Sequence, residues 1–197
     1  RQNVFCPSQI SPLAQKLLNL YPLPLAKYNG RVYNNYDVAT DDTDNTFQWD
    51  VRMDYNASAK DQLFSRFSYI HDQGNRPGQL GPILDGGGFG DTGSINSLGE
   101  QFVFSETHVF NPTLSNEARF GYTYGHFNQL QQNINVDLSA SLGLGGIPFG
   151  PLNGGLPNVA ISGITSFGSP TFYVSDEYQN NYQILDNITK VIGRHSL

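Results

Sequence analysis

The chain has 197 residues and a formal net charge of −6, with 38% hydrophobic, 13% aromatic and only 14% charged residues. Average chains carry about 25% charged residues, and a chain this aromatic is not intrinsically disordered. The single cysteine, Cys6, excludes a disulfide scaffold within the chain and a zinc-ribbon or iron–sulfur site. No run approaches the roughly 20 apolar residues of a membrane helix. The acidic balance argues against nucleic acid as a partner.

Residues 1–45 are predicted to form a loop segment that contains one short helix over 12–21. Ser11 suits the N-cap and Pro12 the first helical position, and leucines follow at helical spacing. The segment ends in the acidic run 41–44, which lacks the glycine and distal glutamate of an EF-hand loop. We therefore interpret this run as a solvated strand-entry loop rather than a calcium site.

Residues 46–197 are predicted to form five β-strands. The clearest one covers 46–55, where every second side chain is apolar or aromatic and every other one is polar or charged. The strand over 116–126 alternates in the same way. Further strands are predicted over 62–71, 101–110 and 178–191, although Phe64 and Ile70 interrupt the polar face of the first of these.

Connections of two very different lengths join these strands. Short turns are predicted at 56–61, 111–114 and 192–195, and long Gly-rich loops at 72–99 and 127–177. Two long structureless loops are uncommon in soluble domains, whereas outer-membrane barrels have short periplasmic turns and long external loops. The sequence therefore predicts an all-β, antiparallel up-and-down meander. It would be a partial transmembrane β-barrel with long extracellular loops and one short N-terminal helix.

A barrel of this kind places apolar side chains toward lipid and polar ones toward the lumen. Five strands cannot close it, because bacterial single-chain barrels have at least eight, so we expect the sequence to be a piece of a longer polypeptide. The predicted lipid-facing residues are Phe47, Trp49, Val51, Met53, Tyr55, Phe120, Tyr122 and Tyr124.

Several segments resemble one family of outer-membrane proteins. Residues 43–55 (TDNTFQWDVRMDY) and 60–69 (KDQLFSRFSY) resemble a barrel hairpin of TonB-dependent receptors, in particular the Oar-like receptors with a carboxypeptidase-regulatory-like domain. Residues 105–122 (SETHVFNPTLSNEARFGY) and the ending 193–197 (GRHSL) are similar to the same proteins. The resemblance covers nearly the whole chain and is weakest in the two Gly-rich loops.

The resemblance implies a location in the outer membrane of a Gram-negative bacterium and uptake of an unidentified solute. Outer-membrane lipid would be one partner, and the TonB complex another, through a plug region that these residues do not include. The segment would supply barrel wall and extracellular loops. An alternative stays open, namely a soluble secreted β-sandwich for binding or adhesion, because inward apolar alternation looks identical there.

Catalysis has no recognisable site in the sequence. The pairs Glu106 and Glu117, or Asp50 and Asp54, are explained by period-two placement on a lumen face, and the four histidines lie far apart. The run 86–90 lacks the Lys-Ser/Thr of a phosphate-binding loop. We therefore predict no enzyme activity and no catalytic, metal-binding or cofactor-binding residue.

The charge distribution predicts the kind of solute. Residues 120–189 contain no Lys or Arg, so an anionic solute would be repelled there, and we expect a neutral or cationic one. The alternative is that loop 127–177 only packs over the barrel mouth. The predicted solute contacts at the loop surface are Phe149, Phe167, Phe172 and Tyr173.

Overall fold

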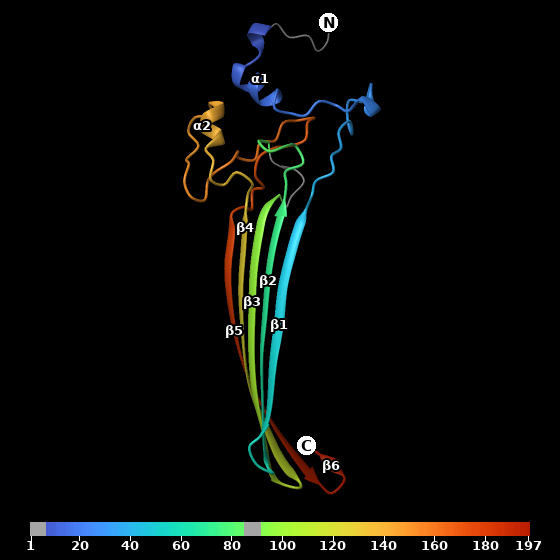
Figure 1. Cartoon of the computed structure of the whole chain (residues 1–197), viewed down its shortest axis with the longest axis vertical. Helices are drawn as coiled ribbons and strands as arrows, with labels where there is room; N and C mark the ends of the chain where they lie inside the picture. The colour runs from blue at the N-terminus through green and yellow to red at the C-terminus, as the bar shows by residue number, and fades with distance from the viewer. Residues whose placement is uncertain (1–6, 85–91) are drawn as a thin grey trace. The chain divides into compact units, whose positions relative to one another are not determined.

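Five long strands and one short strand form a single sheet in the computed structural model, which describes residues 7–84 and 92–197. The strands are β1 (Thr43–Asn56), β2 (Asp61–Arg76), β3 (Gly93–Asn111), β4 (Leu114–Leu130), β5 (Ser175–Ile192) and β6 (His195–Ser196). They follow one another across the sheet in chain order (Figure 1). The helices are α1 (Pro12–Leu18) and α2 (Leu138–Leu142), with 3-10 turns at Pro7–Gln9 and Ala26–Tyr28.

Contacts between neighbouring strands show the antiparallel register. His71 on β2 meets Asn96 on β3, while Asp61, ten residues earlier on β2, meets His108, later on β3. Residue numbers therefore rise along one strand as they fall along the next. The same holds for β4 and β5, where the contacting pairs are His126–Tyr178 and Tyr122–Tyr182. The predicted up-and-down meander is confirmed.

The chain divides into two compact units, which we describe separately. The strand unit comprises Asn45–Gln73, Asn96–Asn128 and Asp176–Leu197. The loop unit comprises Arg1–Asp44, Gly74–Ile95 and Gln129–Ser175. The strand unit thus contains most of the sheet and its short turns, and the loop unit contains the N-terminal segment and the long connections.

The strand unit has two open edges. All residues of β1 are exposed, and nearly all of β5 are, whereas β2 and β4 are mostly half-buried between neighbours. In β3, exposed residues alternate with half-buried and buried ones. At the short-turn end, β6 extends the order past β5, with Ile192 paired to His195 and Val191 to Ser196. The sequence prediction of five strands missed β6 because two residues are too few to show an alternation.

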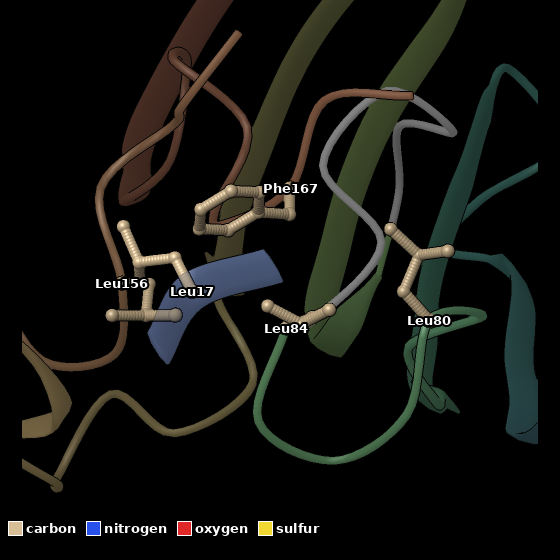
Figure 2. Close-up of a cluster of buried hydrophobic side chains, with 5 residues drawn as sticks. All are labelled: Leu17, Leu80, Leu84, Leu156 and Phe167. Carbon is tan, nitrogen blue, oxygen red and sulfur yellow. The ribbon is translucent and has the colours of Figure 1, made fainter. Parts of the chain in front are cut away.

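The loop unit has a hydrophobic core assembled from three separate segments. Its buried side chains are drawn in Figure 2, and Phe167 and Leu84 are almost completely enclosed. Backbone hydrogen bonds join the segments: Gly168 N–H donates to the Leu84 carbonyl at 2.8 Å. The buried members are Leu17, Leu80, Leu84, Leu156 and Phe167. The two long connections were predicted to be structureless, and their described parts instead contribute to a shared core.

Helix α1 begins as predicted and ends earlier than predicted. Ser11 caps it through its hydroxyl oxygen, which accepts from the Ala14 N–H, and Pro12 is its first residue. The α-helix ends at Leu18 rather than at residue 21. The next backbone bonds tighten to three-residue spacing, Leu20 to Leu17 and Tyr21 to Leu18, as is common at helix ends.

Contacts of α1 with later segments explain why it lies in this core. Lys16 Nζ donates to the carbonyls of Ser141 and Leu142, at the C-terminal end of α2, where a cation is favourable. The Tyr21 hydroxyl donates to the Thr165 carbonyl at 2.5 Å, and burial raises the pKa of Tyr21. Its ring also meets Phe167 edge-on at 5.6 Å.

Helix α2 was not predicted, although its end signals are present in the sequence. The Asp137 carboxylate accepts from the Ala140 N–H at 2.9 Å, and Gly143 ends the helix in the left-handed conformation. Five residues are too few to display a helical hydrophobic period, so only the caps could have revealed it.

The strands are longer than the sequence predicted, chiefly at the end where the long connections leave. β2 continues to Arg76 and β3 begins at Gly93, so the predicted loop 72–99 shortens to 77–92; likewise 127–177 shortens to 131–174. Hydrophobic alternation fades in these extensions, while pairing with neighbouring strands keeps the backbone extended. Cys6 and the whole run 86–90 are outside the described residues.

Candidate functional site

One face of the strand unit carries a set of paired charges. Asp50 on β1 accepts hydrogen bonds from the Arg66 guanidinium at 3.0 Å and from the Ser68 hydroxyl at 2.5 Å. Further along β1, Arg52 donates two bonds of 2.7 Å to Asp54. Each of these carboxylates therefore has a guanidinium partner on the same face.

The same face continues onto β3 and β4. Glu117 accepts from Arg119 at 2.5 Å and from the Ser105 hydroxyl at 3.2 Å. The ion-paired side chains are about half exposed, for example 49% for Arg66 and 41% for Asp50. Such pairs contribute little to stability individually, but they make a wall that is polar and locally charge-balanced.

Two apolar side chains on this polar face have specific partners. The Arg52 guanidinium lies 4.4 Å from the centre of the Phe64 ring, a cation–π arrangement. Ile70 occupies space beside Gly99 on β3, where a Cβ atom would lie only 2.8 Å from Ile70 Cγ2. Phe64 and Ile70, which interrupt the alternation in β2, thus pack against neighbours on the polar face, and that face keeps its polar character.

The opposite face is aromatic. Trp49 stacks on Tyr69 at 5.7 Å and meets Phe67 at 5.4 Å, and Phe47 also contacts Tyr69. On β4 and β5, Tyr122 packs against Tyr182 at 4.9 Å, and its hydroxyl donates to Asn180 at 2.8 Å. The apolar positions of the alternation in β1 therefore belong to an aromatic cluster shared with β2. Those of β4 belong to a second aromatic cluster, shared with β5.

Polar pairs border the aromatic residues toward both strand ends. Near the long connections, His71 bonds Asn96 at 2.6 Å and His126 bonds Asp176 at 2.7 Å. Near the short turns, His108 pairs with Asp61. These three histidines thus have separate partners. In the described part of the chain, no group of three His, Cys, Asp or Glu side chains is arranged to hold a metal ion.

The loop unit contains a cavity of about 410 Å³. Its lining combines aliphatic and proline side chains with uncharged polar groups, among them Gln131 and Ser169. Both of these residues are buried, and neither the Gln131 Oε1 atom nor the Ser169 Oγ atom has a hydrogen-bond partner. Sequence reasoning missed both residues because a glutamine and a serine in irregular chain carry no periodic signal.

A family model described as an outer membrane beta barrel domain matches residues 1–197. The chain belongs to this family. The searches of curated proteins and of solved structures found no match. Among the described residues, no helix has the length and apolar character needed to cross a bilayer.

Membership of the barrel family assigns the strand unit to barrel wall in the outer membrane of a Gram-negative bacterium. The described strands form one sheet rather than the two stacked sheets of a sandwich, so the structure does not support the sandwich alternative. In a barrel wall, apolar side chains face lipid and polar ones face the interior. Arg52, Arg66 and Arg119 with their carboxylate partners lie together on the polar face of the strand unit.

The four predicted solute contacts have different environments. Phe149 and Phe172 are exposed by 51% and 59%, and Tyr173 is partly buried, with its hydroxyl bonded to Gln129. Phe167 is 0% exposed, so its prediction as a surface contact is wrong. Tertiary packing against Tyr21 and the core leucines removes it from the surface, which an isolated aromatic residue in a Gly-rich sequence could not reveal.

Proposed function

We propose that the protein is a TonB-dependent outer-membrane receptor of the Oar-like kind. The strand unit would form part of its barrel wall, and the loop unit part of its extracellular surface, which meets an uncharged or cationic solute. The family supports the wall, and the sequence resemblance described above supports the coupling to TonB. We also propose that the segment has no enzyme activity.

The observation that carries this proposal is the contrast between the two kinds of connection. Turns at one end of the strands are as short as Pro112-Thr113, whereas the connections at the other end build a unit with its own core and cavity. Long loops held on a rigid scaffold are where binding sites concentrate. A barrel that acted only as a structural wall would not require a folded unit made from its loops.

Lipid contact is proposed for the aromatic face. Phe47, Met53 and Tyr55 are 63–65% exposed, and the polar borders lie on either side of the aromatic stretch. Trp and Tyr are common at membrane interfaces, and about 9–11 residues of tilted strand span the hydrocarbon. The alternating stretch of β1 from Phe47 to Tyr55 has about this length.

Coupling to TonB is testable on the complete protein in detergent. We expect it to bind the purified periplasmic domain of TonB from the same bacterium. A TonB-dependent receptor of that bacterium serves as positive control, and a porin, which has a barrel and no TonB coupling, as negative control. If the protein behaves like the porin while the known receptor binds, the receptor proposal is wrong and a passive or structural barrel remains.

A further inference from the structure

A carboxylate of β5 lies on the aromatic face of the strand unit. Tyr182 packs against Tyr122 on that face, and successive residues of a strand point to opposite faces. Asp186, four residues after Tyr182, therefore shares the face with Ile184 and Ile188, which are 83% and 65% exposed. Asp186 is thus an acidic side chain among apolar ones.

A second carboxylate lies close to it, two strands away (Figure 1). The ring pairs of β4 and β5 are spaced by four residues on both strands, and the same spacing places Ala118 opposite Asp186. On the other side of β4, Ser105 bonds Glu117 on the polar face. The residues that follow these two, Glu106 and Ala118, therefore lie together on the aromatic face. Ala118 thus separates two acidic side chains.

Both carboxylates lie at the same depth as Val51. Glu106 is five residues before the end of β3, Asp186 six before the end of β5, and Val51 five before the end of β1. All three strand ends lead into short turns, which lie at one membrane surface in a barrel. Val51 is the middle of the alternating stretch that is long enough to span the hydrocarbon. Glu106 and Asp186 are then near the bilayer midplane, a step that rests on the proposed lipid contact of the aromatic face.

Carboxylates at this depth need a partner. In the described part of the chain, neither Glu106 nor Asp186 has a hydrogen-bond or ion-pair partner, and the Ala118 methyl group cannot supply one. A charged side chain in hydrocarbon is costly, and protonation would remove the charge without providing a hydrogen-bond partner. The stretch of β1 at the same depth has no charged residue on this face. The wall at β3–β5 therefore differs from the wall at β1.

We propose that the acidic surface formed by Glu106, Ala118 and Asp186 docks a membrane-spanning segment of a different protein, which presents a Lys or Arg side chain. The two carboxylates are on strands about 10 Å apart, so one cation over the small Ala118 side chain can reach both. A second copy of this chain in the same membrane would bring its own carboxylates to the same depth, where like charges repel. Lipids carry their cations in the headgroups and not in the hydrocarbon.

Energy transfer in lipid vesicles tests this docking with a defined probe. The complete protein carries a donor dye, and the probe is a transmembrane helix of about 20 Leu and Ala residues with one central Lys and an acceptor dye. The comparison helix has Leu in place of the Lys. We expect the wild type to bind the lysine helix about 10-fold more tightly, as for a hydrogen bond to a charged group. Glu106→Gln combined with Asp186→Asn should remove this preference.

The matched control is Glu100→Gln. Glu100 lies on the same face of β3, six residues further from the short turn and so about 20 Å away along the strand. This variant should keep the preference for the lysine helix. Urea unfolding in vesicles without the probe separates docking from a structural role. The double variant loses two unpaired charges from the lipid, so its midpoint should stay unchanged or rise.

Several outcomes would overturn the proposal. These are equal binding of the two helices by the wild type, a lysine preference that survives in the double variant, a fall in its urea midpoint, or energy transfer between two labelled copies of the protein. None of these measurements needs TonB, so a lysine preference in a protein that fails to bind TonB would refute the receptor function alone. Val51→Arg tests lipid contact independently, which distinguishes failure of the docking surface from failure of the lipid assignment.

Discussion

The strand unit and the loop unit differ in how far their apolar side chains are buried. In the described residues, every buried hydrophobic side chain belongs to the loop unit, and the strand unit leaves Phe47, Met53 and Tyr55 mostly exposed. A water-soluble domain gains its stability by burial, whereas a barrel wall uses lipid as the apolar partner. The two units of one chain therefore place their apolar side chains against different surroundings, and substitutions should affect the two units differently.

The largest expected effect follows from a glycine of the loop unit. A Cβ at Gly168 would lie 1.9 Å from the Pro157 carbonyl oxygen, and its φ of +87° already disfavours other residues. Gly168→Ala should destabilise the loop unit by roughly 4–5 kcal/mol or more, the range of severe substitutions. Limited proteolysis should then cut within 131–174 while the barrel keeps its heat-modifiable migration on a gel. Gly145→Ala, where no atom lies within 4 Å, is the matched control and should resist protease like the wild type.

A core truncation should have the next largest effect. Phe167→Ala removes a completely buried ring, and we expect a loss of about 3–5 kcal/mol in the free energy of unfolding of the loop unit, measured by hydrogen exchange. Phe149→Ala, at a side chain that is 51% exposed, should change it by less than about 1 kcal/mol. Equal losses for the two variants would show that Phe167 does not belong to a core.

A charge introduced on the aromatic face should lower the free energy of unfolding somewhat less than the core truncation does. Val51→Arg is expected to destabilise the complete barrel in lipid by about 2–4 kcal/mol, the penalty for a cation near the bilayer midplane. Gln48→Arg places the same charge on the opposite face, beside Asp50, and should be nearly neutral. Reversible urea unfolding in vesicles measures both. Equal stability of the Gln48→Arg and Val51→Arg variants would contradict the assignment of the aromatic face to lipid.

The smallest effect is expected for an ion pair of the polar face. Asp50→Asn removes the charge that Arg66 and Ser68 bond, but both members of the pair are about half exposed. Such pairs contribute about 0–1 kcal/mol, so unfolding in vesicles should shift by no more than this. A loss above 2 kcal/mol would mean that the polar face is dry rather than water-filled.

Comparison with the sequence predictions shows which features were readable in advance. The alternation from Phe47 to Tyr55 correctly predicted a strand, and the contrast of short and long connections predicted the meander and the barrel class. The strand ends, at Arg76 and Gly93 for example, were placed too far inward, because polar extensions continue by backbone pairing that side-chain patterns do not record.

The candidate site divides in the same way. The polar wall residues Asp50, Arg52 and Arg66 could be assigned to one face from their spacing, since a strand has an exact period of two. The cavity could not be found this way, because Gln131 and Ser169 are 38 residues apart and irregular chain has no period. Their lack of hydrogen-bond partners is visible only once the surrounding chain is placed.

The sequence by itself therefore determined the five long strands, their order and the two faces of β1 and β4, because these are local consequences of alternation and of short turns. Tertiary structure decided what the long connections do. It buries Leu17, Leu84 and Phe167 together from three separate segments. Phe167, which was predicted to lie at the surface, is therefore a core residue. The physical reason is that burial depends on which distant segments meet, and no local pattern of a Gly-rich chain specifies that.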